Sequence, residues 1–474
     1  MSLKRALGPF DATMVVVGGI IGAGIFINPY IVAQRLGSGP LVLGAWIAGG
    51  LVALCGALTF AELGSLKPEA GGHYVYLRDA YHPLAGFLYG WALLLVIESG
   101  AIAAVAITFA EYALRLVGRG SGAAVPLAVT AIVVVTAVNY FGVKPGSRLL
   151  NVFVVLKVAA LGLLIIAGLF MPGGAESPEP GSEAGPPVAG EVSGAPEPDE
   201  AAGSILTAAT AAPGAPQPSP AAPLFIVAFG AALIPVMFSY GGWQNANYIA
   251  EEIVDPQRNV PRSLILGTSI VVVTYVLVNF VYLQVLGHSG LAATLTPAAD
   301  TARRVFGPAG DRFIAGAIAI STFGFLDLTV LAPSRVYYAM ARDGVFFRSV
   351  ARLHPTYQTP SLAIFIQSGW AIGLALTGSY AQLVDYVVFA DWIFFGAAAA
   401  SLFVFRRRQP LADRPPGTFR TFAYPLVPGV MVAAAVLIVA SVLFASPVQS
   451  LLGLLLLAAG VPAFLYWKGR SSPW

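Results

Sequence analysis

Apolar runs of about 20 residues recur along the whole chain, and no other feature limits its fold more strongly. A helix of this length crosses the hydrocarbon core of a bilayer. Only 10% of the residues are charged, whereas soluble domains carry about 25%. The sequence therefore predicts an all-α polytopic membrane protein with about 12 transmembrane helices, because a β-barrel would show short alternating segments instead. The predicted spans are residues 12–34, 41–66, 84–117, 124–141, 149–171, 223–250, 262–286, 311–341, 361–378, 383–405, 421–444 and 448–467.

Basic residues are distributed unevenly between the two sides of these spans. With the N-terminus inside, most of the 26 Lys and Arg residues fall on the inner side. They include Arg406, Arg407, Arg408, Arg414 and Arg420. Because loops rich in Lys and Arg favour the cytoplasmic side, we expect a multi-pass protein of the cell membrane with both termini in the cytoplasm.

The chemistry of the side chains argues against an enzyme. The four histidines are dispersed, and none has metal-ligand spacing to another histidine or to Cys55, the single cysteine. No nucleophile and base occur together at one depth, and no glycine-rich phosphate loop is followed by Lys and Ser or Thr. We therefore expect no enzymatic activity, no metal, no cofactor, no nucleic-acid partner and no direct use of ATP.

Two predicted spans are interrupted by glycine near mid-depth. VVVGGIIGAGIFINPY, residues 15–30, contains four central glycines, each of which lowers helix propensity by roughly 1 kcal/mol relative to alanine. The run from Ser239 to Gly242 interrupts the sixth span in the same way. Interruptions at the first position of successive five-span blocks are typical of inverted repeats.

This pattern predicts four regions. Residues 172–222 are rich in Pro, Gly and Ala, contain acidic residues and lack Lys and Arg, which predicts a disordered external loop. The expected regions are a first repeat at 1–171, this loop at 172–222, a second repeat at 223–408, and two additional spans at 409–474.

Interrupted spans indicate a binding site built from main chain. Breaking a helix frees N–H groups at one end and C=O groups at the other, with partial charges of about +0.5 and −0.5. A zwitterion with a carboxylate and an ammonium one carbon apart would match both ends. The lipid bilayer around the helices is the second expected partner of the protein. The alternative is that the glycines are close-packing contacts between helices, since Gly18 and Gly22 have G-x-x-x-G spacing.

GGIIGAGIF in the first span, FSYGGWQNANYIAEE in the sixth and the following DPQRNVPRSLILG resemble the amino acid–polyamine–organocation superfamily. They are closest to the L-type amino-acid transporters and their bacterial relatives, over about residues 8–470 without the 172–222 loop. The resemblance implies a LeuT-like 5+5 inverted repeat with broken helices 1 and 6, in a bacterial plasma membrane. It also implies secondary active transport of neutral L-amino acids by alternating access, as an antiporter or a proton-coupled symporter. A polyamine or cationic amino-acid transporter of the same superfamily is the alternative. L-type relatives can join a partner through an external cysteine, and Cys55 lies within a span, so no disulfide-linked partner is expected.

The same resemblance implies the substrate-binding residues. The substrate carboxylate is expected to meet the amides around Gly22, Ala23 and Gly24. The ammonium is expected to meet the carbonyls of Ile20, Phe238 and Gly241, and Phe238 aligns with an aromatic gate. Ser239 and Gln244 lie in the same segment and complete the predicted set. The family commonly has Ser where Ala23 stands and Asn where Gln244 stands.

Several charged residues lie within predicted spans, where an unpaired charge costs several kcal/mol. In many bacterial relatives a lysine at the position of Lys157 takes the space of a sodium ion and bridges spans 1 and 8. Glu98 and Asp327 are possible cavity carboxylates, or else buried and protonated. Glu111, Asp385 and Asp391 are expected near span ends at the membrane interface. Glu251 and Glu252, followed by Asp255, Arg258 and Arg262, are either solvated or part of an ion-pair network at an inner gate.

Overall fold

The computed structural model of the chain describes residues 3–171, 222–377, 380–409, 414–445 and 447–470. Within these residues the β structure is limited to one bridge between Leu7 and Ile253, so the predicted all-α class is confirmed. The helices are α1 Pro9–Ile20, α2 Gly24–Ile27, α3 Pro29–Arg35, α4 Gly39–Leu66, α5 His73–Ala80, α6 Pro83–Ala92, α7 Glu98–Leu116, α8 Ala124–Tyr140, α9 Val143–Leu169, α11 Ala222–Tyr240, α12 Asn245–Tyr248, α13 Pro256–Ala293, α14 Pro297–Phe306, α15 Gly310–Leu331, α16 Ser334–Arg342, α17 Ser361–Thr377, α18 Tyr380–Arg408, α19 Leu426–Ala445 and α20 Pro447–Arg470.

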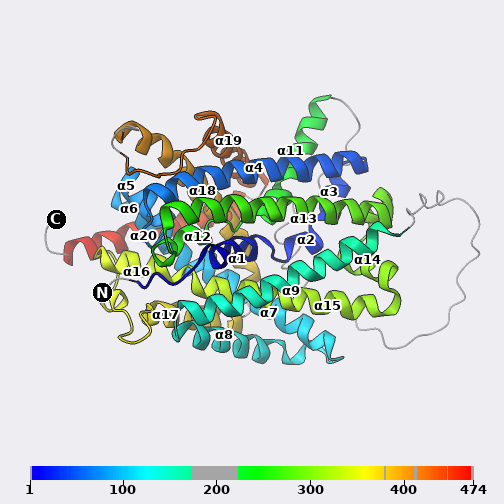
Figure 1. Cartoon of the computed structure of the whole chain (residues 1–474), viewed down its shortest axis with the longest axis horizontal. Helices are drawn as coiled ribbons and strands as arrows, with labels where there is room; N and C mark the ends of the chain where they lie inside the picture. Colours follow the sequence, from blue (N-terminus) through cyan, green and yellow to red (C-terminus); the bar gives the residue numbers. More distant parts are fainter. Residues whose placement is uncertain (1–2, 172–221, 378–379, 410–413, 446, 471–474) are drawn as a thin grey trace, which may run out of the picture.

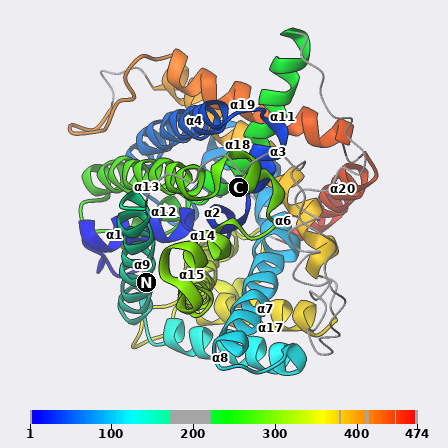
Figure 2. The same ribbon diagram turned by 90° about the vertical axis from the view of Figure 1, so that its right-hand side faces the viewer.

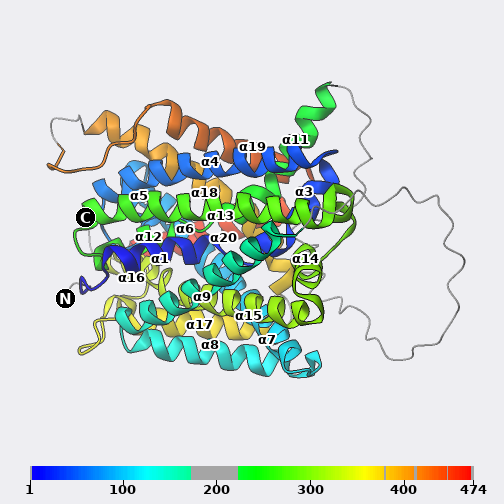
Figure 3. The same cartoon turned by 45° about the vertical axis from the view of Figure 1, so that its right-hand side comes forward.

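The long helices lie side by side along the long axis of the molecule (Figure 1). α1 and α12 lie in the middle, between α4 and α13 on one side and α7, α8 and α17 on the other, and the end-on view shows the same order (Figure 2). The N-terminal segment and the last turn of α20 lie at the same end of the molecule (Figure 3). We call this the terminal end.

Length and composition identify membrane-spanning helices only in part. Within the described residues, seven helices are long and apolar enough to cross a membrane, and Pro9–Ile20, Ala124–Tyr140, Ala228–Tyr240 and Ser361–Thr377 are shorter apolar helices. Large apolar side chains such as Phe170 and Leu437 are exposed on the outside of the bundle, as lipid contact requires. The chain is therefore a polytopic helical membrane protein, and the count of twelve spans stays a prediction.

Both predicted helix breaks are present. α1 ends at Ile20 and α2 begins at Gly24, while α11 ends at Tyr240 and α12 begins at Asn245. The start of α1 is fixed by Pro9 at its first position and by a hydrogen bond that the Gly8 amide donates to Asp11 Oδ2 over 2.9 Å, as expected for a helix N-terminus.

The predicted division into repeats stays a prediction, because helix order alone does not test internal symmetry. The expected loop at 172–222 lies outside the described residues apart from Ala222, the first residue of α11. α19 and α20 follow the predicted second repeat as two separate helices and pack against α4, α6 and α18.

Candidate functional site

The break between α1 and α2 is a tight turn. Ile21 has φ −76° and ψ 89°, and the Gly22 amide donates to the Ile20 carbonyl over 2.9 Å. These angles and this bond define an inverse γ-turn. The helix therefore ends at Ile20 and restarts two residues after Gly22, without the i→i−4 bonds that would normally bridge the gap.

The break between α11 and α12 uses glycine differently. Gly241 donates to the Phe238 carbonyl over 3.2 Å, and Gly242 has φ +111°, a conformation that glycine adopts at little cost. Asn245 then begins α12, and its Nδ2 donates to the Gly242 carbonyl over 3.0 Å. The Asn245 side chain therefore binds one of the carbonyls that the break sets free.

The two breaks pack directly against each other through glycine. A Cβ at Gly19 would lie 2.5 Å from the Gly242 carbonyl oxygen, and a Cβ at Gly242 would overlap the Gly19 carbonyl. A Cβ at Gly24 would lie 2.7 Å from Ser239 Oγ. Close packing and a binding site are therefore compatible here, because the same glycines that break the helices also allow the two broken segments to meet.

Some peptide groups in the two breaks have no hydrogen-bond partner among the described residues. Among the described backbone hydrogen bonds, none is donated by the amides of Ala23 or Gly24, and none is accepted by the carbonyl of Gly241. The Gly22 amide is occupied by Ile20, whose carbonyl also accepts from Tyr275 Oη over 3.0 Å. Of the peptide groups that the resemblance implied, those of Ala23, Gly24 and Gly241 are thus the ones ready for a ligand.

The side chains predicted for the site differ in exposure. Phe238 is 45% exposed, whereas the Ser239 hydroxyl is buried and joins the two broken segments by accepting from Asn28 Nδ2 over 2.8 Å. Gln244 is buried, and its Oε1 has no hydrogen-bond donor. Gln244 therefore offers an unused acceptor next to the break, while Ser239 contributes to packing.

Lys157 of α9 binds the end of α1. Its Nζ donates to the carbonyl of Gly18 over 3.0 Å and to that of Ile21 over 2.6 Å, and the side chain is 1% exposed. Ser321 of α15 donates to the same Ile21 carbonyl over 3.3 Å. The ammonium group thus lies at the carbonyl end of α1, where a positive charge is favourable, beside the span that the resemblance implied.

The structure separates the two cavity candidates. Asp327 is fully buried on α15, and its Oδ1 accepts from Asn139 Nδ2 of α8 over 2.7 Å, so it lies between α15 and α8. Glu98 begins α7 directly after a π-helical turn, η1, at Leu93–Ile97. Asp391 of α18 lies within electrostatic range of Glu98. Asp391 was expected near the interface; it lies well inside α18, which begins at Tyr380, and its side chain is only partly exposed.

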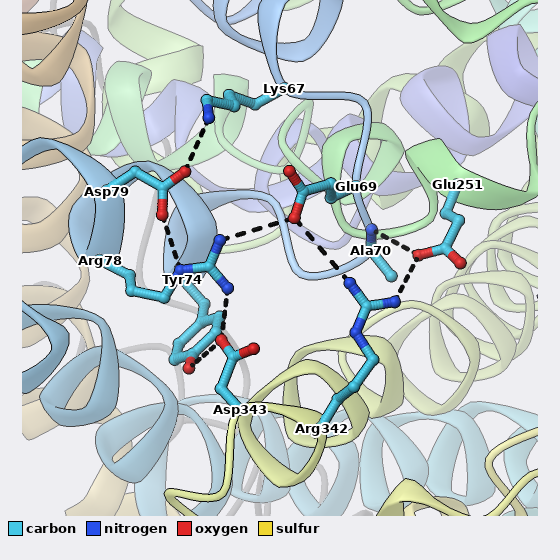
Figure 4. Close-up of polar contacts among 9 residues, drawn as sticks. All are labelled: Lys67, Glu69, Ala70, Tyr74, Arg78, Asp79, Glu251, Arg342 and Asp343. Carbon is cyan, nitrogen blue, oxygen red and sulfur yellow. Dashed lines mark hydrogen bonds and ion pairs between the residues drawn. The ribbon is translucent and has the colours of Figure 1, made fainter. Parts of the chain in front are cut away.

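A network of ion pairs closes the terminal end (Figure 4). Arg78 of α5 pairs with Asp79, Glu69 and, across the bundle, with Asp343. Lys67 also pairs with Asp79, over 2.9 Å. Burial opposes the charge of Arg78, but its hydrogen bonds to Asp79 and Asp343 outweigh burial and hold the pKa of Arg78 above its usual value. We call these residues, with Glu251 and Arg342, the terminal-end network.

The terminal-end network predicts a specific pH dependence. Burial raises the pKa of Asp79, but hydrogen bonds from Arg78 and Lys67 outweigh it, so the pKa lies below its ordinary value of 3.8. Asp79 therefore contributes stability above pH 3.8 that is lost as pH falls through the lowered pKa. We expect the free energy of unfolding of wild type to exceed that of Asp79→Asn by at most about 1 kcal/mol, since the Asp79 ion pairs are partly exposed. Thermal unfolding in detergent between pH 3 and pH 7 should show this difference constant near neutrality and vanishing in acid; a difference that grows on acidification would contradict it.

Of the two alternatives for Glu251 and Glu252, the structure shows ion pairs, with partners other than the charged residues that follow them in the sequence. Glu251 pairs with Arg342 over 3.5 Å, and Glu252 accepts two hydrogen bonds from Arg335 over 2.7 and 3.1 Å. Both arginines belong to α16. Among the described residues, no salt bridge includes Asp255, Arg258 or Arg262. An arginine within a predicted span was the signal in the sequence that could have pointed to this pair.

The Arg335–Glu252 pair is the more costly one to break, because both side chains are at most 1% exposed. Arg335→Ala would leave a buried carboxylate without its partner, and we expect a loss of about 3 kcal/mol in stability. The double variant Arg335→Met with Glu252→Gln should recover most of this loss, because it removes both charges. Thermal unfolding in detergent measures both, and equal losses in the single and double variants would contradict this role.

A second buried cluster connects α4 to the last helices. Glu62 of α4 is fully buried and accepts from Arg406 over 2.8 and 2.6 Å, from Arg414 over 2.7 Å and from the Thr421 amide over 2.7 Å. This cluster could not be predicted from the sequence, because Glu62 is at least 344 residues from each of its partners. It fixes the segment between α18 and α19 onto α4.

A pocket lies at the end of the molecule opposite the terminal end. It has a volume of about 60 Å³ and lies among α2, α7, α14 and α15. Phe26, Tyr112 and Ile318 contribute apolar walls, and Arg115, Arg303 and Asp311 contribute charges. Ion pairs therefore join the helices at the terminal end, and the opposite end has this small pocket, whose lining includes the Arg303–Asp311 ion pair.

Comparison with known proteins gives the same result along the whole chain. A family described as amino acid permease matches residues 7–461. The serine/threonine exchanger SteT of Bacillus subtilis is 28% identical over 473 residues, covering 99% of this chain and 98% of that protein. The human large neutral amino acids transporter small subunit 2 is 30% identical over 482 residues, covering 99% and 82%. The human b(0,+)-type amino acid transporter 1 is 30% identical over 419 residues, covering 87% and 78%.

These matches confirm the resemblance that the motifs of the first and sixth spans indicated, and the relatives are transporters rather than enzymes. Coverage of nearly the whole chain includes both helix breaks and Lys157. The chain therefore belongs to the amino acid permease family of membrane transporters.

Proposed function

We propose that this protein exchanges neutral L-amino acids across a bacterial plasma membrane by alternating access. The observation that carries the proposal is the pair of facing breaks, in which no hydrogen bond among the described residues uses the amides of Ala23 and Gly24 or the carbonyl of Gly241. Free amides and a free carbonyl would hold the carboxylate and ammonium that all L-amino acids share. The printed names of the relatives, an exchanger of serine and threonine and a transporter of large neutral amino acids, support exchange and a neutral side chain.

The conformation fits one state of such a cycle. Ion pairs and the Leu7–Ile253 bridge join the helices at the terminal end, while a small pocket lies at the opposite end and Phe238 is half-exposed. Lysine and arginine concentrate in the loops of the terminal end, which supports placing it in the cytoplasm. In this arrangement the protein faces outward, with Phe238 positioned to cover bound substrate.

Uptake into proteoliposomes tests the proposal. A labelled panel of the twenty amino acids should show uptake of neutral L-amino acids, accelerated by an unlabelled neutral amino acid inside the vesicles. Uptake that is unaffected by internal substrate but driven by a proton gradient would replace exchange by proton symport. No uptake and no binding of any amino acid would contradict the proposed function.

A further inference from the structure

A polar cluster at the centre of the bundle takes no part in the peptide site. Its members are Glu98 of α7, Asp391 of α18, Tyr89 of α6, Tyr248 of α12 and Tyr337 of α16. Tyr89 and Tyr248 are hydrogen-bonded to each other. Both phenols lie within electrostatic range of Glu98 and Asp391. Five elements thus direct polar groups to one place inside a membrane protein, where such groups are costly.

The two carboxyl groups of this cluster have no cationic partner. Among the described hydrogen bonds and salt bridges, none includes the carboxyl of Glu98 or Asp391. Arg335 is the arginine of α16 nearest to Tyr337 in the sequence, and it is already paired with Glu252. A carboxylate at this depth normally pairs with a base or lines a cavity, so the cluster lacks a positive charge.

A further unused group belongs to the cluster. The Tyr337 hydroxyl has no hydrogen-bond partner although its side chain is 1% exposed. Tyr337 lies within electrostatic range of Glu98 and Tyr248. Buried hydroxyl groups in folded proteins almost always have a partner, so the Tyr337 hydroxyl is free to bind a ligand group that enters the cluster.

The backbone before Glu98 is irregular in a way that is typical of functional sites. η1, Leu93–Ile97, is a π-helical turn, and the Ser99 hydroxyl donates to the Leu94 carbonyl five residues earlier, over 2.6 Å. Such turns cost stability and occur mostly where a side chain must be re-aimed. Here the turn ends at Glu98 itself.

The cluster adjoins the break in the sixth span. The ring of Phe395, one turn beyond Asp391 on α18, lies 5.5 Å from the ring of Trp243 between centroids. Tyr248 is on α12, four residues after Gln244, whose Oε1 is also without a donor. The break and the cluster are therefore neighbours, joined through Trp243 and Phe395 on one side and through α12 on the other.

We propose that Glu98 and Asp391 form a side-chain subsite for the cationic end of a basic L-amino acid. The proposal rests on the proposed function, because the peptide site must hold the carboxylate and α-ammonium of the same molecule. A lysine-length side chain supplies the positive charge that the cluster lacks and a donor for its carboxylates. A neutral amino acid would leave the subsite to protons, since two carboxylates within electrostatic range of each other in a low-dielectric interior do not readily both stay charged.

This charge balance gives a second property. When a basic amino acid binds, the proton held by the carboxyl pair is released, so the total charge of the occupied site is unchanged. The groups that face the pair are Tyr89, Tyr248 and Tyr337, with His73 stacked on Tyr89 at 5.3 Å between ring centroids. Binding of a basic amino acid is therefore favoured by higher pH, whereas binding of a neutral one is not.

Competition by a matched pair of ligands tests the subsite. L-Lysine and L-norleucine have the same chain, and only lysine has the terminal ammonium. Each competes in proteoliposomes against one labelled neutral amino acid from the panel described above. For wild type we expect both ligands to compete, and competition by lysine should become stronger as pH rises. In Glu98→Gln and Asp391→Asn, the apparent affinity for lysine in this competition should fall by roughly 10- to 100-fold, as expected for loss of a charged hydrogen bond. The apparent affinity for norleucine should change less than about two-fold. Glu111→Gln, the same substitution further along α7, is the matched control and should leave both unchanged.

The outcomes separate this subsite from the proposed function. If norleucine competes and lysine does not in wild type, the subsite is wrong and the transporter assignment stands. If both variants weaken norleucine as much as lysine, the carboxyl pair is structural and the subsite is wrong. If neutral uptake moves a proton that Glu98→Gln abolishes while lysine never competes, the pair is a proton site, which also overturns the proposal. If no amino acid competes at all, the proposed function fails first.

Discussion

Gly242→Ala is expected to prevent accumulation of folded protein and to abolish transport. A Cβ at this position would overlap the carbonyl carbon and oxygen of Gly19, and these are main-chain atoms that cannot rotate away. Gly242 also has φ +111°, which a residue with a Cβ adopts only under strain of about 1–3 kcal/mol. Together the overlap and the strain place the loss above about 4 kcal/mol, in the range of the rare, most damaging substitutions.

Gly230→Ala is the matched control for this substitution. Gly230 lies in α11, the helix that ends just before the break, and a Cβ there would meet nothing within 4 Å, so alanine should keep transport and raise helix propensity by roughly 1 kcal/mol. Yield of monodisperse protein, thermal unfolding and uptake in proteoliposomes measure both variants. Normal uptake by Gly242→Ala would show that the two breaks are not in contact in the working protein.

The breaks could be predicted from the sequence because their causes are local. Glycine at mid-span weakens a helix, so the two interrupted spans could be recognised from their glycine clusters, although α1 continues through Gly18 and Gly19 before it ends at Ile20. The contact of Gly19 with Gly242 could not be predicted in this way, because it joins residues 223 positions apart by sequence number and depends on how the helices cross. The occupied carbonyl of Ile20 was missed for the same reason, since its partner Tyr275 comes from α13.

Charged residues show the same division. An intramembrane Arg335 had to have a partner, but nothing in its neighbourhood identified Glu252. Asp391 was assigned to the interface from its distance to the nearest polar segment, whereas the packing of α18 against α7 and η1 brings it to Glu98. Depth in a span can be estimated by counting residues, but the direction in which a side chain points depends on tertiary packing.

Lys157→Met is expected to reduce uptake by at least about 100-fold while the protein stays folded. Methionine has a similar length and removes the charge, so packing is preserved, but the carbonyls of Gly18 and Ile21 lose the ammonium that holds them. The Ile21 carbonyl keeps the hydrogen bond from Ser321, but the Gly18 carbonyl loses its side-chain partner, and an unpaired buried carbonyl costs about 1–3 kcal/mol. Both carbonyls lie at the end of α1, next to the free amides of the break. The end of α1 would then relax, and the amides of Ala23 and Gly24 would no longer be aimed at one carboxylate, which lowers transport more than it lowers stability.

Lys157→Arg separates the two ways in which this ammonium could act. Arginine keeps a permanent positive charge. If Lys157 only binds the end of α1, the Lys157→Arg variant should therefore keep partial uptake at every pH. A lysine that exchanges a proton during the cycle should not be replaced, because arginine does not release its proton in proteins, and uptake should then be lost at every pH. Uptake by Lys157→Met and Lys157→Ala with wild-type kinetics from pH 5 to pH 9 would remove Lys157 from the mechanism altogether. Since Ser321 still donates to the Ile21 carbonyl in each variant, any difference among them reports on the ammonium itself and not on the loss of every contact at the break.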